Sequence, residues 1–183
     1  MASGQKGTAA RRAVGSGEAA AGRADSALEP HETALQQFRI VFNAVKTHFQ
    51  QVERKAGVGG AQVWALSVIR ERPGIGVGEL AAALNVRQPT ASIIVRNLSL
   101  QGLAQVLREG PDRRSVQLRI TAEGRKVLRR APGPFSGVLP EALQALDPET
   151  LELLNRGLSQ LILLLDADLR AAKTPLSNLG PQN

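Results

Sequence analysis

Two regularly spaced runs of apolar residues, one near each end of the chain, constrain the fold more than any other feature. Over residues 32–56 the steps between apolar side chains alternate between three and four, at Leu35, Phe38, Phe42, Val45, Phe49 and Val52. After Asp147-Pro148-Glu149, which is typical of a helix start, the same steps recur at Leu151, Leu154, Leu158, Leu161 and Leu165. Such steps place side chains on one face of a helix, so the sequence predicts two long amphipathic helices.

These two helices favour a homodimer. The middle of the chain has no apolar stretch of equal length against which either stripe could pack. Both stripes could still be buried in the core of one subunit. Because they lie at opposite ends of the chain, however, we expect terminal helices that intertwine with those of a second copy across a two-fold axis. The expected dimerisation helices span residues 31–60 and 132–170.

Residues 61–131, between the two stripes, begin with the pattern of a helix-turn-helix. A first helix is expected over residues 61–72. A short helix should then end at Asn85, a residue that tolerates the left-handed conformation of a tight turn. Pro89 suits the first turn of the next helix. On its own, this pattern is also compatible with an ordinary helical hairpin.

A hairpin with a basic tip follows this second helix. Gly102 should end the helix, and the alternating runs at residues 103–108 and 116–120 should form two strands. The turn between them contains Gly, Pro, Asp and two arginines, and Thr121 should cap a final helix. The predicted fold class is therefore mainly α (α+β), a winged helix-turn-helix with long N- and C-terminal dimerisation helices.

Basic charge is concentrated in the same middle region. Residues 74–131 contain ten basic and four acidic residues, whereas residues 132–183 contain three basic and six acidic ones. A localised basic module is expected of a protein that binds nucleic acid. Residues 1–30 are rich in Gly, Ala and Ser, so we expect a disordered tail there. Residues 171–183 are expected to form a flexible C-terminus.

The second helix of the motif should carry the face that reads double-stranded DNA. If Ile94 and Leu98 point inward, then Gln88, Ser92 and Arg96, each four residues apart, share another face. Glutamine can bond adenine through two contacts and arginine can bond guanine, while serine and threonine reach bases or phosphates. The candidate DNA contacts are Gln88, Pro89, Thr90, Ser92, Ile93, Arg96, Asp112, Arg113 and Arg114.

Several motifs of the middle region occur together. They are Leu80-Ala81, Gln88-Pro89-Thr90-Ala91-Ser92, Leu98, Gly102-Leu103, Asp112-Arg113-Arg114, Leu118, Ile120-Thr121 and Gly124. With them, residues 64–130 resemble the MarR family of bacterial winged-helix regulators, and the flanking helices extend the resemblance over about residues 32–170. The resemblance implies a homodimer on a pseudo-palindromic operator, usually a repressor that a small anionic aromatic ligand releases.

The resemblance also implies roles for individual residues. Arg114 would be the wing arginine that enters the minor groove, and Asp112 would orient the wing through a salt bridge. Members of the family often carry a basic or polar side chain where this chain has Ile93, and an acidic or polar one where it has Arg96. Because of these departures, the operator sequence does not follow from the resemblance.

An effector cleft would lie between the dimerisation helices and the winged helix. Aromatic walls with cationic groups nearby suit a small aromatic carboxylate or a phenolic effector. The candidate lining residues are Arg39, Phe42, His48, Phe49 and Trp64. The alternative is that the aromatic side chains simply belong to the core.

Composition argues against other classes of function. The chain has no cysteine or tyrosine and only two histidines, and we find no nucleophile–base pair, so we expect neither an enzyme nor a cofactor. His31 and His48 are 17 residues apart, about 25 Å along one helix, too far to share a metal ion. With no apolar run long enough for a membrane span and no signal region, a cytoplasmic protein is expected. A winged-helix module that binds another protein, without specific DNA binding, stays open as an alternative.

Overall fold

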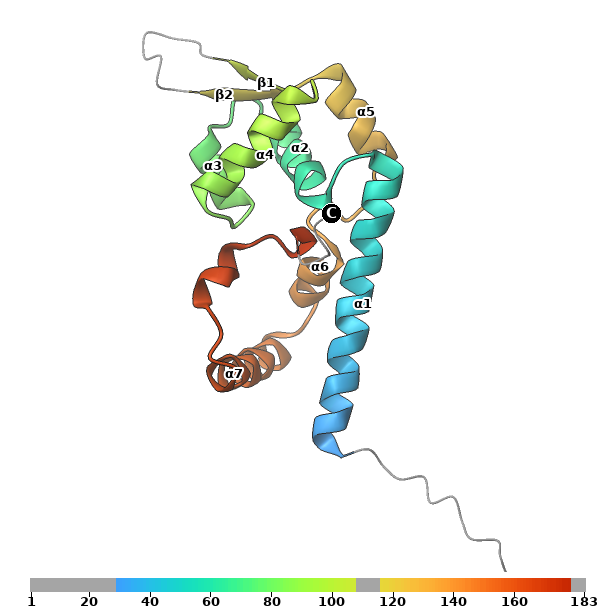
Figure 1. The fold of residues 1–183 in the computed structure, drawn as a ribbon, viewed down its shortest axis with the longest axis vertical. Helices are drawn as coiled ribbons and strands as arrows, with labels where there is room; N and C mark the ends of the chain where they lie inside the picture. Colours follow the sequence, from blue (N-terminus) through green and yellow to red (C-terminus); the bar gives the residue numbers. More distant parts are fainter. Residues whose placement is uncertain (1–28, 108–115, 179–183) are drawn as a thin grey trace, which may run out of the picture.

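The computed structural model describes residues 29–107 and 116–178 and confirms a mainly helical chain with one small sheet (Figure 1). The helices are α1 (Pro30–Ala56), α2 (Gly60–Glu71), α3 (Val77–Ala83), α4 (Gln88–Leu100), α5 (Ala122–Arg130), α6 (Val138–Gln144) and α7 (Pro148–Leu164). Strands β1 (Ala104–Leu107) and β2 (Gln117–Ile120) pair antiparallel, with Ala104 opposite Ile120. Two short 3-10 helices, η1 (Leu169–Lys173) and η2 (Leu176–Asn178), follow α7.

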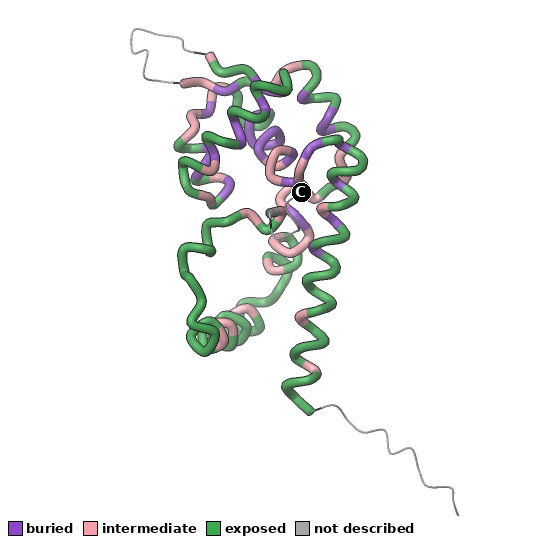
Figure 2. Tube along the Cα trace, viewed as in Figure 1, coloured by how far each residue is buried: buried purple, intermediate pink, exposed green. Residues whose placement is uncertain are grey.

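The core lies in the winged-helix part of the chain. α2 packs against α3, α4, α5 and β2. Fully buried large side chains come from four of these elements: Leu66 and Ile69 of α2, Leu80 of α3, Leu98 of α4 and Leu118 of β2. Figure 2 shows the buried residues gathered here, whereas α7 and the N-terminal half of α1 are exposed. Since burying one such side chain contributes roughly 1.5–3 kcal/mol, this cluster holds α4 firmly against the body.

The turn between α3 and α4 has the predicted geometry. Asn85 adopts the left-handed conformation with φ 52°, and the N–H of Val86 donates to the carbonyl of Ala81 at 3.0 Å. Ala81 is buried, so its small side chain lets the two helices cross closely. Pro89 lies in the first turn of α4, and Gly102, with φ 68°, follows its C-terminus. These local predictions are confirmed.

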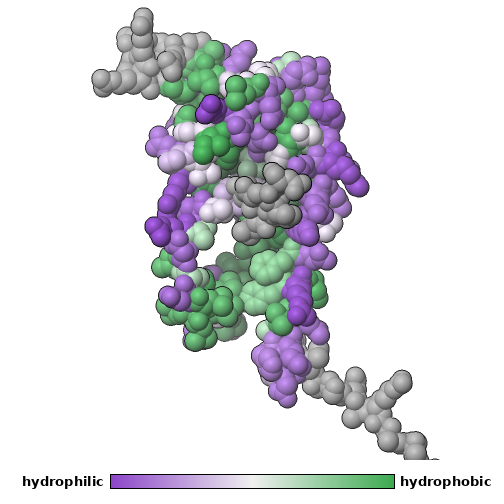
Figure 3. Space-filling view, viewed as in Figure 1, coloured by the Kyte–Doolittle hydropathy of each residue, from purple (hydrophilic) through white to green (hydrophobic). Residues whose placement is uncertain are grey.

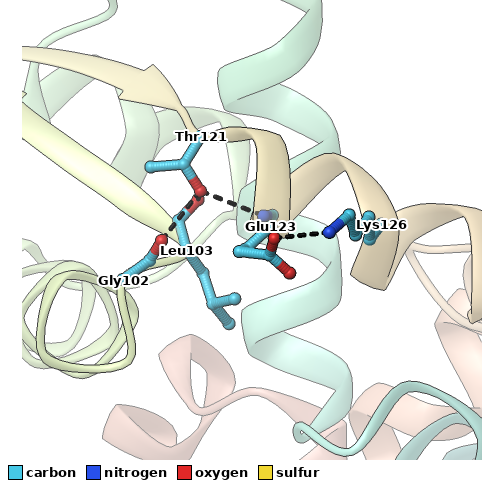
Figure 4. A network of polar contacts seen from close by, with 6 residues as sticks. Gly102, Leu103, Thr121, Glu123 and Lys126 are labelled. Atoms are coloured by element: carbon cyan, nitrogen blue, oxygen red, sulfur yellow. Dashed lines mark hydrogen bonds and ion pairs between the residues drawn. The ribbon is translucent and has the colours of Figure 1, made fainter.

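Thr121 joins the end of α4 to the start of α5. Its hydroxyl lies 2.8 Å from the carbonyl oxygen of Gly102 and 3.0 Å from that of Leu103, and its Oγ1 accepts the N–H of Gly124 at 3.0 Å (Figure 4). Thr121 is therefore the N-cap of α5, as predicted. A Cβ at position 124 would overlap the carbonyl oxygen of Leu103 and lie 2.8 Å from Ile120 Cγ1. This junction therefore requires a glycine.

Replacing Thr121 with valine is expected to lower the free energy of unfolding by about 1–2 kcal/mol. Valine keeps the shape of threonine but can neither accept from Gly124 nor donate to the two carbonyls. Thr121→Ser keeps the hydroxyl and serves as the matched control, with an expected loss under ~0.5 kcal/mol. Urea denaturation of both variants measures the difference. Equal stability of the two variants would contradict this role of the hydroxyl.

The two apolar stripes are only partly buried within the chain. In α1, Val45 and Val52 join the core, whereas Leu35 and Phe42 are 50% and 61% exposed. None of the residues of α7, all of which the structure describes, is buried. Figure 3 shows the resulting apolar surface over α7 and the neighbouring part of α1. The alternative in which one subunit buries both stripes is therefore wrong.

The C-terminal residues fold back toward the winged helix (Figure 1). Residues 171–178, part of the segment for which a flexible terminus was expected, lie in η1, η2 and the link between them, and η2 contacts α1. Asp168 caps η1 by accepting the backbone N–H of Arg170 at 2.9 Å. Lys173 Nζ donates to Asn85 Oδ1 in the helix-turn-helix turn. Composition alone could not predict this contact, because it joins residues 88 positions apart.

Candidate nucleic-acid interface and the adjacent pocket

Helix α4 presents the predicted recognition face to solvent. Its buried residues are Ala91, Ile94, Val95 and Leu98, which hold the helix on the core. Opposite them, the predicted contact residues Gln88, Pro89, Ser92, Ile93 and Arg96 are exposed and Thr90 is half-buried. The arrangement offers amide, hydroxyl and guanidinium groups together on a rigid helix, which is what direct reading of base edges requires.

Arg87 was not among the predicted contacts. It is the exposed N-cap residue of α4, beside the positive end of the helix dipole, where phosphate groups bind favourably. Its position immediately before Gln88 is the sequence signal that could have added Arg87 to the candidate contacts. A basic residue at the start of a helix that reads DNA is suited to a phosphate contact.

The wing is described at its base alone. There β1 and β2 pair in a register that runs from Ala104 opposite Ile120 to Leu107 opposite Gln117. The predicted tip residues Asp112, Arg113 and Arg114 lie outside the described residues, as do residues 1–28 of the predicted tail.

A pocket of about 330 Å³ lies between α1, α2, the α3–α4 turn and the C-terminal segment. Phe49 and Trp64, two of the five predicted lining residues, line it together with Phe135. Phe135 was not predicted, because it lies in the irregular segment between α5 and α6, where no periodicity marks a buried side. The pocket is also bounded by Asn85, so it touches the helix-turn-helix directly.

The other three predicted lining residues lie elsewhere. His48 lines a separate hollow together with Ile40, Asn43 and other residues of α1. It is buried, and its Nε2 has no hydrogen-bond partner among the described residues. Arg39 and Phe42 line neither hollow; Phe42 stacks on Phe38 with ring centroids 6.0 Å apart. Four of the five predicted lining residues lie along α1. Side chains on different turns and faces of one helix do not all reach the same cavity, so the predicted set does not line a single pocket.

The shifted carboxylates are explained by local hydrogen bonds and ion pairs. Lys126 lowers the pKa of Glu123 through a hydrogen bond and its charge. Hydrogen bonds from the backbone and side chain of Thr150 lower the pKa of Asp147, the N-cap of α7. Hydrogen bonds from Arg170 lower the pKa of Asp168, with a further contribution from the charge of Arg87. None of these three residues lines the pocket, so their shifts reflect two helix caps and one local ion pair rather than acid–base chemistry there.

The described part of the chain lacks two other kinds of feature, a metal-binding cluster and a membrane-spanning helix. Within residues 29–107 and 116–178, no three His, Cys, Asp or Glu side chains are grouped so that they could hold a metal ion. None of the helices described there combines the length and apolarity needed to cross a membrane.

Comparison with known proteins gives a family match over part of the chain and a shared fold. The sequence profile of the MarR family matches residues 56–115, which confirms the resemblance over that region. The chain is similar to a crystal structure of a MepR-like protein complexed with pseudoligands, with 16% identity over 76% of this chain and 100% of that one and a TM-score of 0.51. It is also similar to the crystal structure of the S. aureus MepR–DNA complex, with 21% identity over 72% of this chain and 97% of that one and a TM-score of 0.50. At these identities the likeness shows a shared fold. No curated protein matches the chain significantly.

Proposed function

Because residues 56–115 match the MarR family, we propose that this chain is a sequence-specific DNA-binding transcription regulator and not an enzyme. The observation that carries this proposal is the geometry of α4, whose exposed Gln88, Ser92 and Arg96 stand opposite a buried face formed by Leu98 and its neighbours. One of the two similar structures named above is a complex with DNA. The regulator acts on DNA in the cytoplasm, and it is a repressor.

In this function α4 enters the major groove. Gln88 and Arg96 read adenine and guanine edges, and Ser92 and Thr90 reach bases or phosphates. Ile93, which is 61% exposed, contacts a thymine methyl group, the one apolar feature of the major-groove edge. Arg113 and Arg114, oriented by Asp112, reach the minor groove from the wing.

The regulator is a homodimer. Exposed apolar side chains line α1 and α7, among them Phe42 and Leu154, and contiguous apolar surface of this kind marks an interaction site; the helices of a second copy would cover it. Two-fold symmetry then places two α4 helices in successive major grooves, about 34–36 Å apart. The operator is accordingly a pseudo-palindrome. In this organisation residues 61–131 bind DNA, and residues 31–60 and 132–170 form the dimer.

A small aromatic effector releases the regulator from its operator. Phe49 and Trp64 line the pocket beside Asn85, so a molecule bound there contacts the turn that sets the position of α4. A change of a few degrees in α4 is enough to misplace side chains that must meet base edges within hydrogen-bonding distance.

Arg96→Ala is expected to weaken binding to the preferred operator by roughly 1–3 kcal/mol and to relax the preference at one base position. Arg114→Ala is expected instead to weaken binding to most sequences alike, because its partner is the narrow groove rather than one base. Arg54→Ala removes the same charge from the C-terminal turn of α1 and is the control. Fluorescence anisotropy on an operator and its single-base variants makes the comparison. If Arg96→Ala and Arg114→Ala both bind like the parent and like the Arg54→Ala control, the recognition surface has been assigned to the wrong residues.

Salt dependence separates this function from a protein-binding winged helix. A DNA-binding regulator loses affinity steeply as salt rises, because bound phosphates release counterions. A module that has kept the fold but binds a protein partner should show only weak binding to DNA, independent of sequence. The exposed Ile93 and Leu100 on α4 are the features that would suit such a partner.

A further inference from the structure

The C-terminal residues 169–177, named here the strap, form one wall of the pocket. Six strap residues line it: Ala171, Ala172, Thr174, Pro175, Leu176 and Ser177. The end of the strap lies close to the start of α2. A Cβ added to Gly60 would be 3.3 Å from Ser177 Cβ. The pocket therefore exists only while the strap is folded back.

The pocket has an uncharged lining. Phe49, Trp64 and Phe135 supply aromatic surface, and the polar side chains Asn85, Ser136, Thr174 and Ser177 are all neutral. No Lys, Arg, His, Asp or Glu occurs among the described residues that line it. The start of α2 adds a partial positive potential of roughly half an elementary charge, less than a cationic side chain would supply. Lys173 bonds to the pocket residue Asn85 but is exposed and does not itself line the pocket, so a carboxylate would lose its hydration here without a counter-charge in the lining.

The strap is tied to the DNA-binding motif by a hydrogen bond. Lys173 Nζ donates to Asn85 Oδ1, and Asn85 is the left-handed residue that sets the turn between α3 and α4. Asp168, which immediately precedes the strap, has its pKa lowered by hydrogen bonds from Arg170 and, to a smaller extent, by the charge of Arg87, the N-cap residue of α4. The strap thus bridges the pocket and the N-terminus of the recognition helix.

We propose that the pocket binds an uncharged aromatic molecule and that the strap transmits its presence to α4 through the Lys173–Asn85 contact. A ligand that fills the pocket presses on both the strap and the turn, since both bound it, and separates Lys173 from Asn85. The ligand class deepens the effector role proposed above and replaces the anionic ligand expected from the sequence. The expected effect of the molecule on DNA binding rests on the proposed function. The expected binding of the molecule in the pocket does not.

The binding claim is tested with the full chain and two probes of equal shape, biphenyl-4-carboxamide and biphenyl-4-carboxylate. Trp64 is the only tryptophan of the chain and lines the pocket, so its fluorescence reports occupancy. The carboxamide is expected to change this emission and to bind at least tenfold more tightly than the carboxylate at neutral pH. Tighter binding of the carboxylate would overturn the ligand class, and no response to either probe would overturn the site. Both outcomes are read without DNA.

The coupling claim is tested with variants at both ends of the contact. Asn85→Gly keeps the left-handed turn accessible and removes the acceptor, and Lys173→Ala removes the donor. Arg170→Ala removes the same charge from the strap but leaves Lys173 in place, and is the control. The carboxamide is expected to weaken DNA binding of the parent and of Arg170→Ala at least fivefold.

Lys173→Ala and Asn85→Gly are each expected to bind DNA about three- to tenfold more weakly without ligand, as for one lost hydrogen bond, and to lose most of the response to the carboxamide. If both variants bind DNA and respond like the parent, the coupling is wrong. If the parent itself binds no DNA, the proposed function fails, while the fluorescence result still decides whether the pocket binds the probe.

Discussion

Replacing Gly124 with alanine is expected to lower the free energy of unfolding by about 2–3 kcal/mol. The added Cβ would overlap the carbonyl oxygen of Leu103 and lie 2.8 Å from Ile120 Cγ1, and overpacking of this kind costs roughly 1–3 kcal/mol. The oxygen cannot move away freely, because it accepts the N–H of Thr121 at 3.1 Å and lies 3.0 Å from its hydroxyl. Alanine favours a helix over glycine by only about 1 kcal/mol, so the steric cost dominates.

Gly78→Ala is the matched control for this substitution. Gly78 is an exposed residue of α3, and nothing lies within 4 Å of a Cβ built there. It should therefore leave the stability unchanged or raise it by up to ~1 kcal/mol. Urea denaturation followed by circular dichroism measures both variants. A Gly124→Ala variant as stable as the Gly78→Ala variant would show that the start of α5 does not lie against Leu103 and Ile120 as described.

Replacing both Leu158 and Leu161 with glutamate is expected to convert the proposed dimer to monomers and to abolish specific DNA binding. These side chains belong to the stripe of α7, a helix without any buried residue in the single chain. Burying two carboxylates without partners costs several kcal/mol, which corresponds to a loss of at least about a thousandfold in dimer affinity. Specific DNA binding is lost with the dimer because two half-sites must be read together.

Leu153→Glu is the control for this pair. Leu153 is 55% exposed and lies on another face of α7 from the stripe, so the same change in chemistry there should leave the dimer intact. Sedimentation equilibrium gives the oligomeric state of both proteins, and anisotropy gives their DNA binding. A Leu158→Glu/Leu161→Glu protein that remains dimeric would place the interface elsewhere.

The local features of the winged helix could be predicted because each depends on neighbouring residues. Asn85 marks the left-handed turn, Gly102 follows the end of α4, and Thr121 caps α5. Asparagine and glycine tolerate the left-handed conformation, and threonine accepts a backbone N–H at a helix start. These effects depend only on residues a few positions away. The inward direction of Ile94 and Leu98 followed from helical spacing alone.

The pocket could be predicted only in part because it is assembled from distant segments. Spacing along α1 shows which side chains share a face, but it does not show where the core ends, so Phe42 was grouped with Phe49 although only Phe49 reaches the cavity. Phe135 and the strap residues have no periodic pattern that would place them. The contact between Lys173 and Asn85 depends on the path of the chain after α7, which no local rule determines.

Selection of bound fragments from a random DNA pool by the purified full-length protein, at physiological salt, tests the central claim most directly. A dimeric winged-helix regulator should recover a pseudo-palindrome whose half-sites are about ten base pairs apart. The Arg96→Ala protein should recover the same spacing with one base position relaxed. Recovery of no common motif, with only weak and salt-sensitive binding, would contradict a sequence-specific regulator.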